Sequence, residues 1–183
     1  MYNTITFMYL FYTEKEEKMK IDTERLELVA LLPQQLKLLT TNIEKLEEEL
    51  DAKYKAEPME GFFLDIVKGQ VEATEKDSEN YFWHSFWLLI RKSDRVIVGS
   101  ADFKDIPNKD CEVEIGYGLG KDFEHNGYMT EAVMAMSQWA LKQDGVSSVI
   151  AETEIDGFAS QRILKRCGFK KYKEEATTWW RLR

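Results

Sequence analysis

Hydrophobic and polar positions follow two different spacings in the first third of the chain. Leu26, Leu28 and Ala30 alternate with polar residues, and this alternation predicts a strand within residues 20–32. After Pro33 the apolar residues recur every three or four positions, which predicts an amphipathic helix. The residues with this helical spacing are Leu36, Leu39, Ile43, Leu46 and Leu50. Residues 60–74 continue the helical region, and a further short helix is expected around 74–81.

The middle of the chain is rich in aromatic and β-branched residues. Two such runs within residues 84–105 are joined by the polar stretch 92–95, and together they predict a β-hairpin. Residues 111–120 predict another strand, because their apolar and charged side chains alternate. Its two faces are Val113, Ile115 and Tyr117 on one side and Glu112 and Glu114 on the other.

The last third predicts a helix, a strand, a shorter helix and a closing strand. One apolar stripe marks the helix that follows Gly127, and Gly145 is its expected stop signal. The stripe consists of Met129, Ala132, Val133, Met136 and Ala140. The later elements are expected over residues 147–155, 159–169 and 177–183.

These elements mix helices and strands without an internal repeat or a low-complexity linker. A chain of 183 residues is long enough for one core, so we expect a single α+β domain over residues 19–183. Residues 1–18 are expected to be an N-terminal extension, because organised sequence begins just after Met19. The apolar part of the extension has only about a dozen residues, too few to span a bilayer.

The charge balance limits the partners of the protein. Asp and Glu number 33 against 25 Lys and Arg, which gives a net charge of −8. This balance opposes binding to nucleic acid, which needs concentrated positive charge. It favours cationic ligands, and the acidic run over residues 44–57 points the same way.

Cysteine and histidine usage indicates neither a redox motif nor a metal site. Cys111 and Cys167 are not in a CxxC spacing, and His84 and His125 do not form a ligand set with nearby Cys or acidic residues. Unpaired core cysteines are typical of a reducing compartment, so a cytoplasmic protein is expected.

The junction around Gly127 is the first candidate for chemistry. A strand ends near Leu119, a loop follows, and a helix begins just after the glycine. A helix N-terminus carries partial positive charge and unpaired amides, and both favour a bound phosphate group. Glycine lets the backbone approach a ligand closely. The simpler alternative is that Gly127 serves only as a turn residue.

The motifs on both sides of this junction resemble those of the GNAT superfamily of acetyl-CoA-dependent N-acetyltransferases. Within it, the chain is most similar to the ribosomal-protein N-terminal acetyltransferase branch. The resemblance extends over residues 20–183 and begins with the "TERLELVAL" strand. The matching residues are Glu114, Ile115, Gly116, Tyr117, Gly127, Tyr128, Thr130, Glu131, Ala132, Ala151, Glu152, Ser160, Leu164, Gly168 and Phe169.

The resemblance implies a fold and a cofactor. The fold has a central mixed, mostly antiparallel sheet of about six or seven strands, splayed between the fourth and fifth, with about four or five flanking helices. The cosubstrate is acetyl-CoA, and no metal is required. Backbone amides in the loop are expected to hold its diphosphate, and main-chain groups near Leu119 its pantetheine arm. The loop residues are Glu124, His125, Asn126, Gly127, Tyr128, Met129 and Thr130.

The chain departs from the family pattern in this region. The family prefers Gln or Arg at Glu124, Gly at His125 and a small residue at Met129. Gly157 replaces an asparagine of the second motif. An inward carboxylate at Glu124 would repel a diphosphate, whereas its amide would remain a donor. These departures keep open the alternative of a degenerate GNAT-fold module that binds coenzyme A or a partner without catalysis.

Acyl transfer to an amine needs a proton acceptor, and the sequence offers two carboxylates. The resemblance places a base-like glutamate at Glu152, and Glu114 lies on the neighbouring strand. The alternative is that both are solvated charges. The resemblance also makes Ser160 the hydroxyl that faces the sulfur, since Leu164 occupies the position of the tyrosine used by other relatives. A helix-capping role for Ser160 is the competing interpretation.

We therefore expect a cytoplasmic N-acetyltransferase that moves acetyl from acetyl-CoA to a primary amine by direct attack. The amine is a protein N-terminus or a small molecule, and the acidic surface favours a cationic acceptor. The helical segment 33–80 is expected to form much of the acceptor wall. The protein is expected to be a monomer or a homodimer, without nucleic-acid or membrane partners. An interaction protein built on the long helices and the extension is a further alternative.

Overall fold

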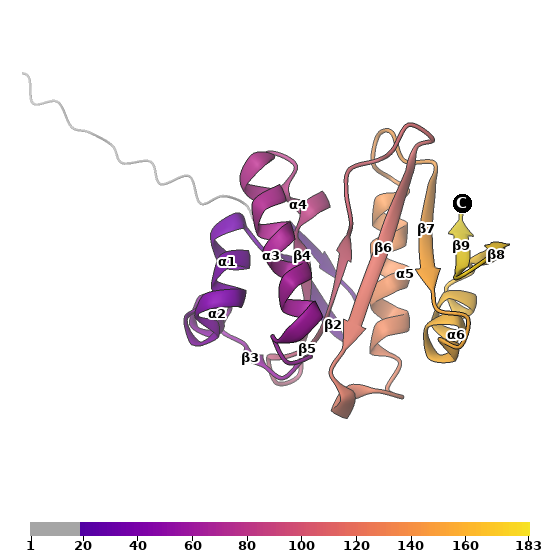
Figure 1. The fold of residues 1–183 in the computed structure, drawn as a ribbon. Coiled ribbons are helices and arrows are strands. Elements are labelled where there is room, and N and C mark those ends of the chain that lie inside the picture. The colour runs from indigo at the N-terminus through magenta and orange to yellow at the C-terminus, as the bar shows by residue number, and fades with distance from the viewer. Residues whose placement is uncertain (1–18) are drawn as a thin grey trace, which may run out of the picture.

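A computed structural model describes residues 19–183, and Figure 1 shows their arrangement. The extension predicted for residues 1–18 lies outside the described residues. Six α-helices occur in the described chain: α1 (Pro33–Thr41), α2 (Ile43–Leu50), α3 (Gly61–Lys76), α4 (Tyr81–His84), α5 (Tyr128–Ala140) and α6 (Phe158–Arg166). A 3-10 turn, η1 (Lys121–Phe123), precedes α5.

Nine strands form one mixed sheet in residues 19–183. They are β1 (Lys20–Asp22), β2 (Leu26–Ala30), β3 (Lys53–Tyr54), β4 (Phe86–Arg91), β5 (Val96–Phe103), β6 (Glu112–Leu119), β7 (Ser148–Thr153), β8 (Lys170–Glu174) and β9 (Thr178–Leu182). Their spatial order is β1-β2-β4-β5-β6-β7-β9-β8, with β3 beside part of β5. The neighbours are antiparallel except for β6–β7 and β3–β5.

This architecture confirms the predicted α+β fold with a mostly antiparallel sheet. The strand number exceeds the expected six or seven because β1 and β3 have only three and two residues. Segments this short cannot show an alternating pattern. β8 was also not foreseen, since all its residues are exposed and none of them alternates with a buried one.

Strands β6 and β7 diverge, which opens the sheet between them. The resemblance implied such a separation between the fourth and fifth strands of the fold. These two strands pair only from Glu112 to Glu114 of β6, opposite Ser148 to Ile150 of β7. β6 then continues to Leu119 with its other edge hydrogen-bonded to β5. The edge of β6 that faces β7 is therefore left open over its second half.

Helices cover both faces of the sheet. In Figure 1, α1, α2 and α3 lie on one side of β4 and β5, and α5 lies on the opposite side. α6 packs beside α5 and next to β7. Each face has its own core of buried side chains, because the strands in the middle of the sheet bury residues on both sides.

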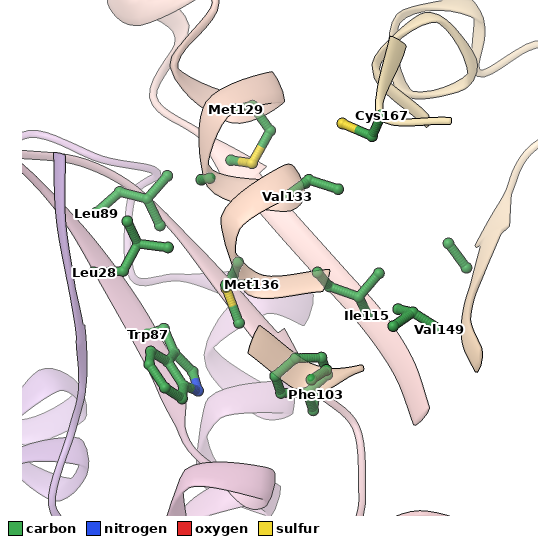
Figure 2. Packing of buried hydrophobic residues seen from close by; sticks show 14 of the residues in the cluster. Leu28, Trp87, Leu89, Phe103, Ile115, Met129, Val133, Met136, Val149 and Cys167 are labelled. Carbon is green, nitrogen blue, oxygen red and sulfur yellow. The ribbon is translucent and has the colours of Figure 1, made fainter. Parts of the chain in front are cut away.

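The predicted apolar stripe of α5 is confirmed as the centre of the larger core. Met129, Ala132, Val133, Met136 and Ala140 are all at most 3% exposed. Figure 2 shows the α5 side chains among residues of the central strands and the last helix. Because α5 is fixed along its whole length, its first residue has a defined position at the open end of the sheet.

The single helix predicted from Pro33 to Leu50 is wrong in one respect, since the structure divides it at Asn42. Asn42 has an extended φ of −158°, and its side-chain oxygen accepts a hydrogen bond from the Lys45 amide at 3.1 Å. This contact caps α2 and begins a new helix. The short helix expected around 74–81 lies slightly later, as α4.

Trp87 holds together the aromatic part of the larger core. Its side chain is fully buried, its ring centroid lies 5.1 Å from that of Trp139, and its Nε1 donates to the Phe82 carbonyl at 2.9 Å. We expect Trp87→Phe to lower the free energy of unfolding by about 2 kcal/mol, because it removes both packing volume and a buried hydrogen bond.

Urea denaturation followed by circular dichroism measures this change. Phe158→Ala is the control, since Phe158 is 62% exposed and its loss should change the free energy of unfolding by no more than about 0.5 kcal/mol. Equal stability losses in the two variants would contradict a core centred on Trp87.

Candidate active site

The loop before α5 has an unusual backbone path. His125 has a φ of 62° and Gly127 a φ of 79°, so both residues are in the left-handed region. A side chain in this conformation costs roughly 1–2 kcal/mol, which a glycine avoids. The geometry explains why the family prefers glycine at the position of His125. The loop therefore holds His125 in a backbone conformation that is unfavourable for a residue with a side chain.

That shape leaves a row of backbone amides without partners. Within the described chain, no acceptor receives the amide hydrogens of residues 125–130, and the first helical bond runs from the Glu131 amide to the Gly127 carbonyl. The Glu124 amide is different, because it donates to the Lys121 carbonyl at 3.3 Å. Unpaired amides at a helix N-terminus form a site for an anion.

The three side chains of the loop that depart from the family pattern lie away from these amides or in solvent. Met129 is 3% exposed and packs in the core, so its bulk does not fill the loop. The side chains of Glu124 and His125 are 55% and 92% exposed. Gly157 begins α6 without a side-chain cap.

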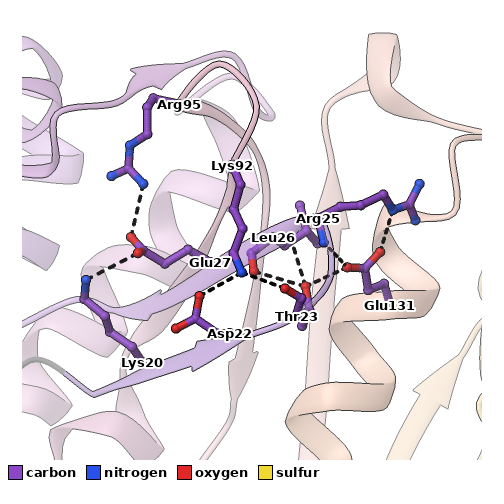
Figure 3. A network of polar contacts seen from close by, with 9 residues as sticks. All are labelled: Lys20, Asp22, Thr23, Arg25, Leu26, Glu27, Lys92, Arg95 and Glu131. Atoms are coloured by element: carbon purple, nitrogen blue, oxygen red, sulfur yellow. Dashed lines mark hydrogen bonds and ion pairs between the residues drawn. The ribbon is translucent and has the colours of Figure 1, made fainter.

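An ion pair joins the loop to the strands at the other end of the sequence. Arg25 donates from Nε to Glu131 at 2.7 Å, and from Nη1 to the Asn126 carbonyl at 2.9 Å. The Thr23 hydroxyl donates to the second oxygen of Glu131 at 2.6 Å, and Figure 3 shows this network. Together these donors hold the pKa of Glu131 below its usual range against the opposing effect of burial. Thr23 and Arg25, near the start of the described chain, and Glu131 of α5 therefore hold the loop in place together.

A pair of hydroxyls connects β6 to α6 beside the open edge. The Ser160 hydroxyl donates to the Tyr117 hydroxyl at 2.9 Å, and Tyr117 in turn donates to the Ser160 carbonyl at 3.3 Å. Burial raises the pKa of Tyr117 to about 12, so its hydroxyl stays protonated. The competing interpretation of Ser160 was a helix-capping role. Its hydroxyl makes no such hydrogen bond to the backbone of α6.

The structure places both predicted carboxylates on one face of the sheet. Glu114 lies on β6 and forms an ion pair with Lys104, the residue that directly follows β5. Glu152 lies on β7, beyond the point where the two strands separate, and accepts a hydrogen bond from the Thr177 hydroxyl. Its neighbours Val149 and Ala151 point into the core on the α5 side, so Glu152 faces the other way, toward solvent.

A cavity of about 580 Å³ opens on the same face, between α3 and the strands β4, β5 and β6. It contains a carboxylate that the sequence analysis missed. Asp102 is 6% exposed, and burial raises its pKa to about 6. Gln70 of α3 donates to Asp102 Oδ2 at 2.8 Å, which partly opposes the shift.

Two glycines of β6 make room for acidic groups above the strand. A Cβ at residue 116 would lie 2.7 Å from Asp102 Oδ1, and a Cβ at residue 118 would collide with Glu57 Oε2. Glu57 is the second acidic group missed by the sequence analysis, and burial raises the pKa of its carboxyl as well. Glu57 is the last residue of the acidic run 44–57. The sequence shows its charge but not its position above Gly118.

The described residues offer neither a metal site nor a membrane span. No group of three or more His, Cys, Asp or Glu side chains in residues 19–183 is placed to hold a metal ion. No helix in that range is long and apolar enough to cross a bilayer.

Comparisons with known proteins agree with this fold. A family profile described as "Acetyltransferase (GNAT) domain" matches residues 32–170, well over half of the chain. The uncharacterized N-acetyltransferase YjdG of Bacillus subtilis is 34% identical over 83 residues, which cover 45% of this chain and 49% of the relative. The uncharacterized N-acetyltransferase YoaA of the same species is 27% identical over 85 residues, covering 46% and 48%. The chain thus aligns with about half the length of these curated relatives.

Solved structures share the architecture at low sequence identity. An acetyltransferase of Salmonella typhimurium that modifies the N-terminal serine of a ribosomal subunit protein superposes with a TM-score of 0.62 at 16% identity, covering 90% of this chain and 98% of the other. The microcin self-immunity acetyltransferase MccE, solved with acetyl-CoA and AMP, has a TM-score of 0.61 at 17% identity, covering 87% and 93%. The profile match, the separated sheet and the loop before α5 together show that this chain belongs to the GNAT acetyltransferase family.

Proposed function

We propose that this protein transfers the acetyl group of acetyl-CoA to a primary amine. The observation that carries the proposal is the row of unpaired amides at the start of α5, directly beside the open edge of β6. A diphosphate satisfies such amides, and the open strand edge accepts an extended chain that carries carbonyl and amide groups. Coenzyme A has both features.

The coenzyme follows the path from the helix to the strand. Its diphosphate is held by the amides of residues 125–130, with Glu124 at the border of the site and Arg25 fixing the loop through the Asn126 carbonyl. Its pantetheine arm runs along β6 near Leu119 towards Tyr117, between β6 and β7. The acetyl group then lies between the two walls of the separation, within reach of the cavity.

The reaction joins the amine nitrogen to the acetyl carbon and breaks the bond between that carbon and the sulfur. The proton lost by the amine goes to a carboxylate, and the departing thiolate takes a proton or a hydrogen bond from the Ser160 and Tyr117 pair. Asp102 is the carboxylate best suited to accept the proton, since it lines the cavity and its pKa of about 6 lies near neutral pH. Glu152 and Glu114, the two carboxylates predicted from the sequence, are the alternative proton acceptors.

Glu124 allows a direct test of the diphosphate position. Glu124→Lys exchanges a negative for a positive side chain beside the proposed diphosphate, so it should tighten acetyl-CoA binding about fivefold or more at low ionic strength. Isothermal titration calorimetry gives the dissociation constant, and the gain should shrink as salt is added.

Glu48→Lys is the matched control, because Glu48 is an exposed residue of α2 on the opposite face of the sheet. Both variants change the net charge equally. The proposal predicts a large effect only for Glu124, and equal effects of the two substitutions would place the diphosphate elsewhere.

The Asp102→Asn variant tests whether Asp102 is the proton acceptor. We expect kcat to fall roughly 100-fold or more, as for the loss of a proton acceptor, with the dissociation constant of acetyl-CoA unchanged. Release of free thiol from acetyl-CoA measures the rate. Asp110→Asn, at an exposed position, should leave both quantities unchanged. A kcat that survives in Asp102→Asn but falls in Glu152→Gln or Glu114→Gln would move the role to that residue.

The same variant should be more stable than the wild type at neutral pH. The pKa of Asp102 is raised from 3.8 to about 6 on folding, so the folded state loses stability as the pH rises through that window. Asparagine has no such loss. The difference in the free energy of unfolding should therefore grow between about pH 4 and 6, level off above, and reach at most about 3 kcal/mol. A difference that is independent of pH would contradict the raised pKa.

A coenzyme-binding module without catalysis predicts another outcome. Acetyl-CoA would then bind as above, while no primary amine would increase the release of thiol in the wild type.

A further inference from the structure

The cavity beside Asp102 has two chemically different parts. One is apolar and comes mainly from α3, with Phe62, Phe63 and Ile66 facing Phe86 of β4. The other is polar, lies over β5 and β6, and is lined by Glu57, Gln70 and Asp102. A ligand that fills this space needs a charged end and an apolar body.

The polar part is spaced to hold an ammonium group. Asp102 stands over Gly116 and Glu57 over Gly118, which lie two residues apart on the same face of β6. Two residues along a strand span about 7 Å, so the two carboxylates lie close enough together for one ammonium group to be placed between them.

Gln70 supplies a third acceptor. Its amide nitrogen is used by Asp102, and its Oε1 is buried with no donor among residues 19–183. A buried acceptor without a partner is costly, and a donor from a ligand would satisfy it. A primary ammonium has three N–H donors, which matches Asp102, Glu57 and Gln70 Oε1.

The charges around the cavity leave its negative end uncompensated. Lys104 also lines the cavity, but its ammonium pairs with Glu114. Glu57 has no ion pair with a described residue. A cationic ligand would supply the charge that balances Asp102 and Glu57.

Two large apolar side chains of the apolar part are exposed to solvent, and a bound ligand would cover them. Phe62 is 81% exposed and Ile66 40% exposed, and they lie one helical turn apart on α3 at the cavity. Large apolar side chains grouped at the mouth of a pocket mark a binding surface.

We infer that the acceptor is a primary amine with a compact apolar body, its ammonium held by Asp102, Glu57 and Gln70 and its body against Phe62 and Ile66. The inference rests on the proposed function for its meaning as a substrate site. The volume of about 580 Å³ suits a small molecule. Polyamines would place a second ammonium at the apolar end, where no carboxylate lines the cavity, and amino sugars would bring hydroxyls without partners there.

Binding of defined amines tests the inference without requiring acetyl transfer. The probes are 2-phenylethylamine, methylamine, spermidine, glucosamine and a short peptide with an N-terminal serine, each titrated into the coenzyme A-saturated protein. We expect 2-phenylethylamine to bind at least tenfold more tightly than each of the others. Tighter binding of spermidine, glucosamine or the peptide, or binding of none of the probes, would overturn the inference.

Variants then assign the two ends of the ligand. Glu57→Gln should weaken the binding of 2-phenylethylamine at least fivefold. Ile66→Ser should weaken it about threefold or more with no effect on methylamine, since only the apolar body is lost from the contact. Ile106→Ser is the matched control, because Ile106 is 46% exposed and lies outside the cavity. Equal effects of Ile66→Ser and Ile106→Ser would overturn the assignment of the apolar end.

The outcomes also distinguish this inference from the proposed function. Selective amine binding without any release of thiol from acetyl-CoA would leave the cavity as an amine site and remove the acetyl transfer. Release of thiol with hydrophilic amines only would keep the transfer and remove the apolar acceptor.

Discussion

The rest of the structure depends on the limited pairing between β6 and β7. The two strands share hydrogen bonds only from Glu112 to Glu114, after which β6 continues to Leu119 paired with β5 alone. The half of β6 beyond the pairing has an open edge, and the loop that follows it leads directly into α5. Because α5 is anchored along the core by its apolar stripe, its unpaired amides are held beside that open edge. A strand edge and a helix N-terminus thus become parts of one site.

The two faces of β6 then have separate roles. One face carries Val113, Ile115 and Tyr117 against α5 and α6, and it keeps the helix start in place. The other face carries Gly116 and Gly118, whose missing side chains leave space for Asp102 and Glu57. A ligand bound along the open edge would therefore meet the floor of the cavity at these glycines. Burial at this position disfavours the charged form of Asp102 and so raises its pKa.

Sequence reasoning succeeded where one element determines the feature. The stripe of α5, the alternation of β6 and the position of Gly127 all follow from local spacing, and the structure has each of them. It failed where several distant segments combine. Asp102 occurs in an ordinary strand pattern, and Glu57 at the end of an acidic run, so nothing local marks them. Their importance arises from α3 closing over β5 and β6, and that packing has no signature in residue spacing.

The central claim is that the amides of residues 125–130 hold a diphosphate. An NMR titration of the 15N-labelled protein tests it most directly, with coenzyme A and pantetheine compared as ligands, because pantetheine lacks the diphosphate. The account predicts that coenzyme A gives its largest amide shifts within residues 125–130, and that pantetheine leaves those signals nearly unchanged while shifting signals of β6. Equal shifts of the loop signals with both ligands, or no loop shifts with coenzyme A, would contradict the account.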